Sequence, residues 1–310
     1  MANGFDSTAA KSGFRATRAR AGRSPCTATT GIPSPINGAT WKAPFTKYAD
    51  EGERAKGKKW QSVGLEMTSV LKLKFHPKEP KLGYASASDM AGFVTEDGGL
   101  TWRIAKVQWN TNYDYAFDPA DTELVYAASG HNHDYPLNGW NQVVKTSGGI
   151  YKSVNRGHKW TRLTPDTVEW NRQFLSVAYD PINAILYGGS QGGGIGRSLD
   201  GGKTWEWIND GLPAATGRII PQIEIDPANG NVYVLLTGDA PAYSNREGTG
   251  IYLSTAGRGP VQWMLMRGSV EKPEEVGSQY KLWWYPTAFA VDFTRPRRDV
   301  MWLVDMEVKG

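Results

Sequence analysis

Carboxylate side chains occur at positions where short apolar runs of the sequence end. Asp89, Asp134, Asp239 and Asp305 stand at the end of such a run or in the loop that follows it. A carboxyl group at the mouth of a fold accepts hydrogen bonds when ionised and can transfer protons in general acid-base chemistry. These four aspartates are therefore our candidate catalytic residues.

Aromatic, amide and cationic side chains occupy other positions at the ends of apolar runs and in the adjoining loops. We expect ligand contacts from His131, His133, Trp140, Trp170, Arg172, Gln191, Arg218, Trp283 and Trp284. Aromatic faces stack on pyranose rings, while polar groups satisfy sugar hydroxyls that lose water on binding. Together with the aspartates, this set predicts a sugar-binding cleft. Taken singly, each residue has the alternative interpretation of an ordinary solvated loop side chain.

A repeated turn indicates which elements hold these residues. Three segments of eight residues follow one pattern, at 95–102, 153–160 and 198–205. Ser or Thr ends a strand, Asp or Asn caps the reversing backbone, Gly takes the positive-φ position, and Trp opens the next strand. A unit of about 40 to 60 residues that repeats in this way is typical of a propeller blade.

Alternating apolar and polar residues around these turns predict the strands of each blade. We expect an all-β chain that forms a β-propeller of four-stranded blades, with about five blades visible. The blades are expected near residues 65–107, 112–163, 174–208, 220–266 and 286–310. The propeller would occupy residues 41–310.

The fifth blade has sequence for only two strands, so closure of the ring needs an explanation. We consider a fragment of a larger propeller, an open arc, or a five-bladed ring in which residues 300–310 pair with a strand at 58–64 that contains Trp60. Unpaired strand edges invite association, so a second propeller domain or a second copy are expected partners.

Blade topology separates ligand loops from structural turns. In a blade whose strands a to d run outward, the b-to-c and d-to-a loops share one face, and the repeated turns lie on the other. The long insertions at 129–148 and 237–249 enter on the loop face. Loops on a rigid scaffold are where binding residues are usually placed. We therefore expect the ligand on this face.

Composition excludes several other classes. No run of about 18 apolar residues is present, so we expect no membrane span. The formal charge is only +4, with much of the excess in the first 23 residues, which argues against nucleic-acid binding. Only four His and one Cys occur. Although His131, His133 and Asp134 could chelate a metal, we expect neither a metal site nor a cofactor.

Residues 1–40 differ from the rest of the chain. Ser, Thr, Ala, Gly and Pro dominate, with interspersed Arg and no apolar segment of the kind found in a signal peptide. We interpret them as a disordered leader or a gene-prediction artefact. A basic tail that binds an acidic partner is the alternative.

The repeated turns resemble the Asp-box, or BNR, repeats of sialidases, sortilin-type receptors and photosystem assembly factors. The segment 73–92, with Phe75-His76-Pro77 and Tyr84 followed by Asp89, further resembles the opening blade of glycoside hydrolase family 74, the xyloglucanases. In that family the matching segment reads Tyr-Ala-Arg-Thr-Asp-x-Gly-Gly. Ser88 here replaces its Thr, and Ala91 replaces its first Gly.

The resemblance implies a function. The Asp of the family motif is one of two catalytic carboxylates, which implies that Asp89 serves hydrolysis of a β-glucan such as xyloglucan. Its second Asp lies in another propeller, so Asp134, Asp239 and Asp305 are candidates for a partner. A noncatalytic propeller that binds a glycan, peptide or protein is the alternative, and the resemblance to sialidases is weaker. By family the protein would be extracellular.

Overall fold

The structure is a computed structural model that describes most of the chain after residue 45. The described residues are 46–50, 57–62, 70–131, 147–213, 218–237, 248–268, 286–298 and 301–305. All regular elements in these ranges are strands, joined by turns and loops. The region predicted to be a leader, residues 1–40, lies outside the described residues.

Four antiparallel sheets of four strands succeed one another along the chain. Blade 1 consists of β3 (Val70–Phe75), β4 (Gly83–Ala87), β5 (Gly92–Thr95) and β6 (Arg103–Ile104). Blade 2 consists of β7 (Thr111–Asp118), β8 (Asp121–Gly130), β9 (Gly148–Ser153) and β10 (Thr161–Arg162). Blade 3 consists of β11 (Phe174–Asp180), β12 (Ile185–Ser190), β13 (Ile195–Ser198) and β14 (Glu206–Trp207). Blade 4 consists of β15 (Ile219–Ile225), β16 (Val232–Thr237), β17 (Gly250–Ser254) and β18 (Met264–Gly268).

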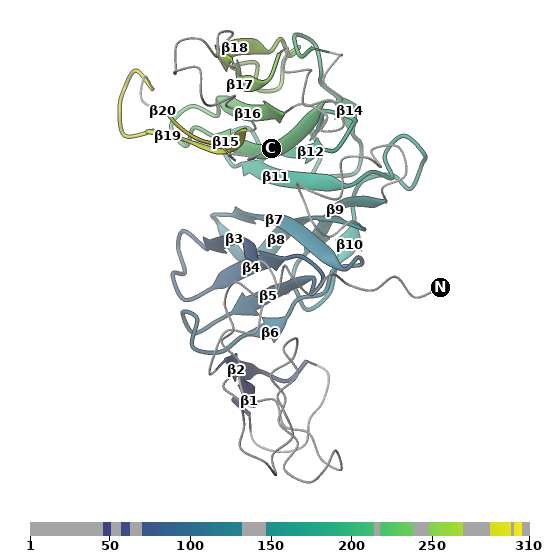
Figure 1. Ribbon diagram of the computed structural model, residues 1–310, viewed down its shortest axis with the longest axis vertical. Helices are drawn as coiled ribbons and strands as arrows, with labels where there is room; N and C mark the ends of the chain where they lie inside the picture. The colour runs from purple at the N-terminus through teal and green to yellow at the C-terminus, as the bar shows by residue number, and fades with distance from the viewer. Residues whose placement is uncertain are drawn as a thin grey trace, which may run out of the picture.

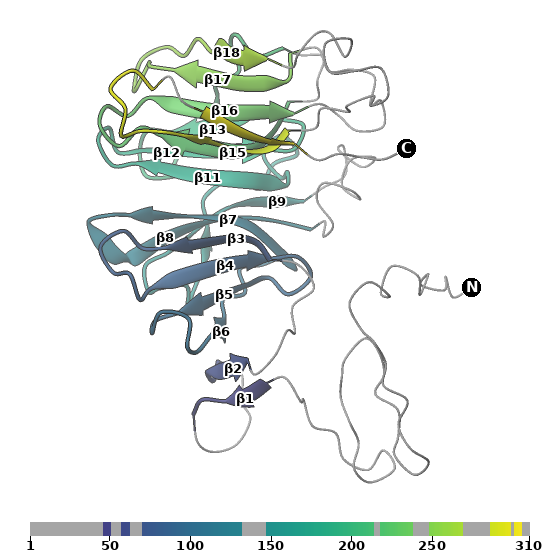
Figure 2. The same ribbon diagram turned by 60° about the vertical axis from the view of Figure 1, so that its left-hand side comes forward.

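Two further sheets have two strands each. Blade 5 pairs β19 (Pro286–Val291) with β20 (Met301–Asp305). A separate hairpin pairs β1 (Thr46–Tyr48) with β2 (Trp60–Ser62) and lies beyond β6, next to blade 1 (Figures 1 and 2). The predicted all-β propeller of four-stranded blades is thus confirmed.

The strand pairing does not support the five-bladed closed ring. β2 pairs with β1 in the register Tyr48 to Trp60, and β20 pairs with β19. Within the described residues no ladder joins β20 to β2, so of the three alternatives the closed five-bladed ring is not the one observed. The described blades form an open arc (Figure 1).

The innermost strands of the blades converge on one axis. Leu71, Tyr113, Leu175 and Ile219 come from β3, β7, β11 and β15 and pack into one apolar cluster. Between adjacent blades, larger clusters form from alternate strand residues; Tyr84 and Tyr115 lie with ring centroids 5.2 Å apart between blades 1 and 2. Burial of each such ring contributes about 1.5–3 kcal/mol. These interfaces fix the order of the blades.

A buried carboxylate connects three of the innermost strands. Asp114 in β7 has only 1% of its side chain exposed and accepts hydrogen bonds from Lys72 Nζ at 2.9 Å and from Val177 N at 3.4 Å. Lys74 Nζ lies 2.7 Å from its other oxygen. Burial opposes ionisation of Asp114, yet the two ammonium groups hold the pKa of Asp114 below its usual range. Lys72 Nζ also donates to Pro221 O at 3.2 Å, which adds β15 to the connection.

The first repeated turn has a side-chain hydrogen-bond pattern. Thr95 Oγ1 donates to Asp97 Oδ1 at 2.8 Å and accepts from Gly99 N at 2.8 Å. Asp97 Oδ1 also accepts from Thr101 N at 2.9 Å, while Trp102 Nε1 donates to Gly99 O at 3.1 Å. The Asp carboxylate thus accepts from a backbone N–H that the reversal leaves without a backbone partner.

The third turn repeats this pattern with Ser198, Asp200, Gly202 and Trp205. The second keeps it in part, because Asn155 Oδ1 accepts from Ser153 Oγ and Lys159 N, both at 2.9 Å. One amide oxygen can therefore take the place of the carboxylate for these contacts.

We predict that Asp114→Asn lowers the free energy of unfolding by about 2–3 kcal/mol, because it leaves two inward-facing ammonium groups without their counter-charge. Urea denaturation provides the measurement. The control is Asp166→Asn. Asp166 pairs with Arg162 and has 75% of its side chain exposed, so its substitution should change the free energy of unfolding by at most about 0.5 kcal/mol. Equal effects of the two variants would contradict the role assigned to Asp114.

The turn carboxylates predict an acid-dependent loss of stability. Hydrogen bonds from Thr204, followed by a smaller contribution from Ser198, lower the pKa of Asp200 to about 2. Since its folded pKa is depressed, Asp200 stabilises the fold above its unfolded pKa of about 4, and this contribution disappears as the pH falls towards 2. In Asp200→Asn the amide retains the acceptor role seen at Asn155. We expect unfolding curves recorded from pH 5 to pH 2 to show a weaker pH dependence for this variant, and an unchanged dependence would contradict the assignment.

Candidate functional site

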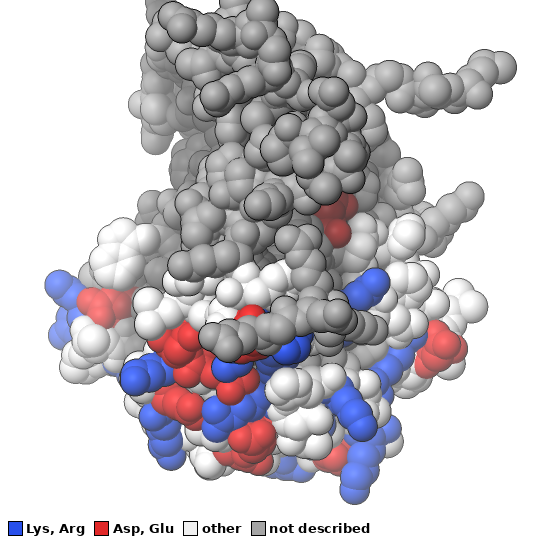
Figure 3. Space-filling model, turned by 90° about the horizontal axis from the view of Figure 1, so that it is seen from below, with Lys and Arg blue, Asp and Glu red and all other residues white. Residues whose placement is uncertain are grey.

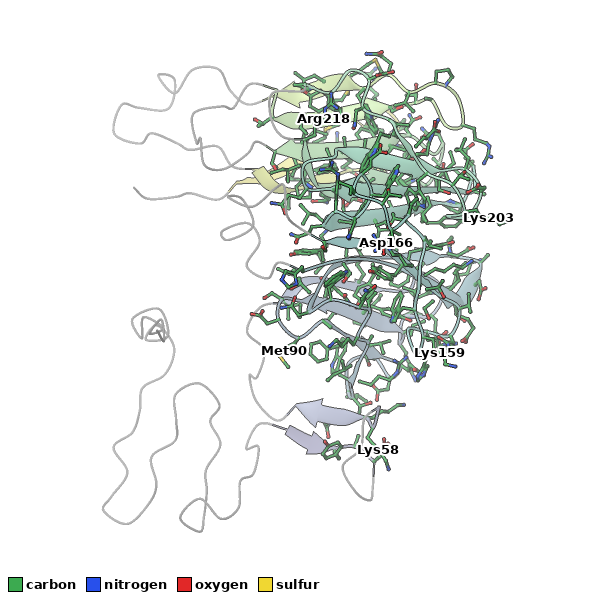
Figure 4. All side chains as sticks on the ribbon, turned by 90° about the vertical axis from the view of Figure 1, so that its right-hand side faces the viewer. Lys58, Met90, Lys159, Asp166, Lys203 and Arg218 are labelled. Carbon is green, nitrogen blue, oxygen red and sulfur yellow. The ribbon has the colours of Figure 1, made fainter. Side chains whose placement is uncertain are left out.

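The two faces of the arc carry different loops. Met90, in the b-to-c loop of blade 1, lies on one face, whereas Lys159 and Lys203 in the repeated turns lie on the opposite face (Figure 4). The ligand residues predicted from sequence belong to loops of the Met90 face. We call it the loop face and the other the turn face.

Asp89 lies in a short, unusual loop between β4 and β5. It is exposed, with a φ of 60°, and Ala91 follows with a φ of 65°. Asn110 Nδ2 donates to Asp89 Oδ1 at 3.3 Å, and Asp89 N donates to Thr111 Oγ1 at 3.4 Å. Ala91 N donates to Asn110 O at 2.6 Å. Hydrogen bonds with Asn110, in the loop before β7, therefore hold the Asp89 loop in place and orient its carboxylate.

A buried polar group supports this junction. Asn112 is fully buried, and its Nδ2 donates to Tyr115 Oη at 2.7 Å. A Cβ on Gly92 would lie 2.0 Å from Tyr115 Oη, so the strand after Asp89 can approach β7 only as glycine. Burial raises the pKa of Tyr115, which keeps its hydroxyl protonated at neutral pH. The base of the Asp89 loop is thus closely packed.

An aromatic group that the sequence analysis missed lies beside this loop. Trp109 immediately precedes Asn110, and its ring meets that of His131 edge-on at 5.7 Å between centroids. Trp109 Nε1 donates to Tyr151 Oη at 3.1 Å, and Tyr151 Oη donates to Gln108 Oε1 at 2.8 Å. His131 is exposed at the end of β8. The position of Trp109 between β6 and β7, in a loop that joins two blades, was the available signal.

Two predicted ligand residues lie in the interior. Trp170 is 6% exposed and stacks on Trp207, with ring centroids 4.1 Å apart and ring planes inclined by 5°. Its ring therefore forms part of the core. Gln191 is fully buried, where its Oε1 accepts from Gln173 Nε2 at 3.0 Å. The structure therefore places both as packing residues, because their strands end deeper in the fold than the sequence pattern suggested.

Arg172 and Arg218 lie at the entrances to β11 and β15. Arg172 Nε donates to Glu169 O at 2.7 Å, and Arg218 Nε donates to Pro213 O at 3.3 Å. Both side chains are half-buried. They stay on the loop face, one blade or more along the arc from Asp89.

Several predicted residues lie outside the described part of the chain. These are Asp134, Asp239, His133, Trp140, Trp283 and Trp284. Asp305 is the last residue of β20, where its backbone pairs with Pro286. The structure therefore brings together Asp89 with Asn110, and His131 with Trp109, on neighbouring loops of blades 1 and 2.

The described residues offer an exposed carboxylate, an amide and an aromatic group rather than a metal centre. Within these ranges no three His, Cys, Asp or Glu residues are grouped for a metal ion. The described part contains no helix long and apolar enough to cross a membrane. On the described surface visible in Figure 3, Lys and Arg alternate with Asp and Glu. The arrangement on the loop face can accept protons or hydrogen bonds at Asp89 beside an aromatic edge.

Sequence comparison finds relatives over part of the chain. A xyloglucanase of Hypocrea jecorina (strain QM6a) is 31% identical over 174 residues, which is 51% of this chain and 19% of the relative. A xyloglucanase of a Paenibacillus species is 36% identical over 118 residues, or 35% of this chain and 11% of the relative. The chain thus spans less than a fifth of the length of either protein. No protein-family model matches the chain.

Structural comparison supports the same architecture. The GH74 xyloglucanase of Xanthomonas campestris superposes with a TM-score of 0.51 at 20% identity, over 72% of this chain and 32% of that enzyme. An ancestral GH74 enzyme gives a TM-score of 0.50 at 22% identity, over 67% of this chain and 27% of that one. At these identities the likeness shows the fold. The chain is a GH74-like β-propeller with xyloglucanases among its relatives.

Proposed function

We propose that this propeller binds a β-glucan chain of the xyloglucan class on its loop face and that Asp89 is one carboxylate of a two-carboxylate glycoside hydrolysis. One observation carries the proposal: Asp89 is exposed on the loop face and accepts from Asn110, whose chain neighbour Trp109 meets the ring of His131. The relatives named xyloglucanases supply the substrate class. The expected location is accordingly extracellular.

Hydrolysis of a glycosidic bond requires a carboxylic acid to protonate the leaving oxygen and a carboxylate to activate water or attack the sugar. Asp89 accepts a hydrogen bond from the Asn110 amide and is exposed to solvent, so its carboxyl group is accessible to a bound glycan. Asp134, Asp239 and Asp305 remain the candidates for the second group. A further propeller, on a longer chain or another subunit, is the alternative source of that second group.

The backbone at Asp89 supports a functional role. A positive φ costs a non-glycine residue roughly 1 kcal/mol or more, and such strain is concentrated at functional sites. Asp89 and Ala91 both have such values, and Ala91 occupies the position where the resembling family has Gly. The fold therefore tolerates a strained loop in order to present the carboxylate.

The repeated turns are proposed to be Asp boxes. Their support is the shared pattern in which a Ser or Thr hydroxyl and an Asp or Asn side chain hold one reversal, followed by a Trp. They lie on the turn face and have a structural role there.

We predict that two Ala→Gly substitutions in this region have different costs. Ala91→Gly loses a buried methyl group but relieves the positive φ, so the free energy of unfolding should change by less than about 0.5 kcal/mol. Ala87→Gly, in β4, loses an equally buried methyl group without any relief and should cost about 1–2 kcal/mol. Urea denaturation compares the two, and equal costs would show that the loop is unstrained.

We predict that the purified chain releases reducing sugar from xyloglucan and that Asp89→Asn lowers the rate at least about 100-fold while the variant still binds the polymer. Asp166→Asn is the control with an exposed carboxylate elsewhere. Binding without turnover by the parent chain would reject self-sufficient hydrolysis and favour a recognition propeller. Absence of binding to any β-glucan would reject the substrate class.

A further inference from the structure

Most described arginines have a carboxylate partner. An ion pair is formed by each of Arg103, Arg156, Arg162, Arg197, Arg295 and Arg298. Arg156 shows the pattern, since its guanidinium bridges Glu79 and Glu123 across the turns of blades 1 and 2. Pairing of this kind neutralises the positive charge locally.

The two arginines on the loop face differ from this pattern. Within the described residues, no carboxylate lies within ion-pair distance of Arg172 or Arg218, and both guanidinium groups donate hydrogen bonds to backbone carbonyls. Arg172 donates to Glu169 O, and Arg218 donates to Pro213 O and, at 3.5 Å, to Leu212 O. Carbonyl oxygens fix the direction of a guanidinium without removing its net charge. Such a group is oriented in advance for an external anion.

A loop of three glycines contacts both arginines. In Gly192-Gly193-Gly194, a Cβ on Gly193 would lie 3.0 Å from Arg172 Cδ, so the arginine stem lies against this loop. Gly194 N donates to Arg218 O at 3.1 Å on the other side. A Cβ on Gly193 would lie 2.7 Å from the Trp207 ring and one on Gly194 would lie 2.1 Å from Asn209 Oδ1, so this loop can contact both arginines only as glycine. Arg218 lies towards the same side of the molecule as Met90 (Figure 4).

We propose that Arg172, Arg218 and the 192–194 loop form a subsite for the carboxylate of an acidic sugar, so that the polysaccharide recognised on this face contains uronic acid. The planar guanidinium matches a carboxylate through two parallel hydrogen bonds. The inference rests on the proposed function, since Asp89 and the Trp109 pair on the same face supply the rest of the glycan site. It extends that function from a neutral to an acidic substrate.

The two arginines and Asp89, which carry opposite charges, lie at different parts of the loop face. Arg172 and Arg218 serve blades 3 and 4, whereas Asp89 belongs to blade 1. An anionic substituent is thus attracted to one part of the loop face and repelled from the carboxylate at the other. This difference would fix the direction in which a polymer lies across the face.

The test uses matched ligands that differ only in charge. We would measure binding of the intact chain to cellohexaose and to the same hexamer oxidised to uronic acids at C6, by calorimetry at low salt. The oxidised hexamer should bind at least about tenfold more tightly, the equivalent of about 1.4 kcal/mol. Arg172→Gln and Arg218→Gln should each remove most of this preference, so that the two hexamers bind with similar affinity.

Arg258→Gln provides the matched control. Arg258 is also held by carbonyls, of Asn183 and Leu199, but it lies by the turns of the other face. Its substitution should leave the preference intact, and thermal unfolding of each variant verifies the fold. Equal affinity for both hexamers, or a preference that survives in the double variant, would overturn the subsite while the proposed function stands.

Two other results would also reject the inference. Polyglutamate that binds as tightly as the oxidised hexamer, with the same dependence on Arg172 and Arg218, would assign the site to acidic peptides. Failure of both hexamers and of xyloglucan to bind would reject the inference together with the proposed function.

Discussion

The arrangement of blades depends on how a carboxylate can be buried at the axis. Asp114 of β7 is tolerated there because Lys72 and Lys74 of β3 and the amide of Val177 in β11 stabilise its charge. The cluster of Leu71, Tyr113, Leu175 and Ile219 packs around the same axis. A polar connection of this kind has one satisfactory geometry, whereas apolar packing alone tolerates small rotations. The angle between successive blades, and hence the position of each loop, follows from it.

The two faces of the arc divide their tasks. On the turn face, polar side chains are used up within the fold, as in the bonds of Asp97 and Asp200 and the ion pairs of Arg156. On the loop face, neighbouring groups orient the exposed side chains of Asp89 and His131 and the half-buried side chains of Arg172 and Arg218. A rigid scaffold that orients polar side chains on one side is what a binding site requires.

The fold could be predicted further than the site. Alternation in the run 70–75 and the β-branched and aromatic residues of 232–237 specify strands, and the repeated turns specify how they connect, because these signals are local. Burial at strand ends is not local. Trp170 and Gln191 occupy loop-like positions in sequence, yet neighbouring strands cover them, while Trp109 emerges beside Asp89. That Arg172 and Arg218 meet no carboxylate among the described residues depends on the positions of several loops and has no sequence signature.

The lengths of the strands differ between the axis and the rim of the arc. β7 and β11 have eight and seven residues, whereas β6, β10 and β14 have two each. A strand of two residues contributes few ladder bonds, so its amide protons should exchange with solvent long before those near the axis. Stability thus increases radially inward, and the rim is where sequence can be inserted or exchanged without disturbing the geometry of the ligand loops.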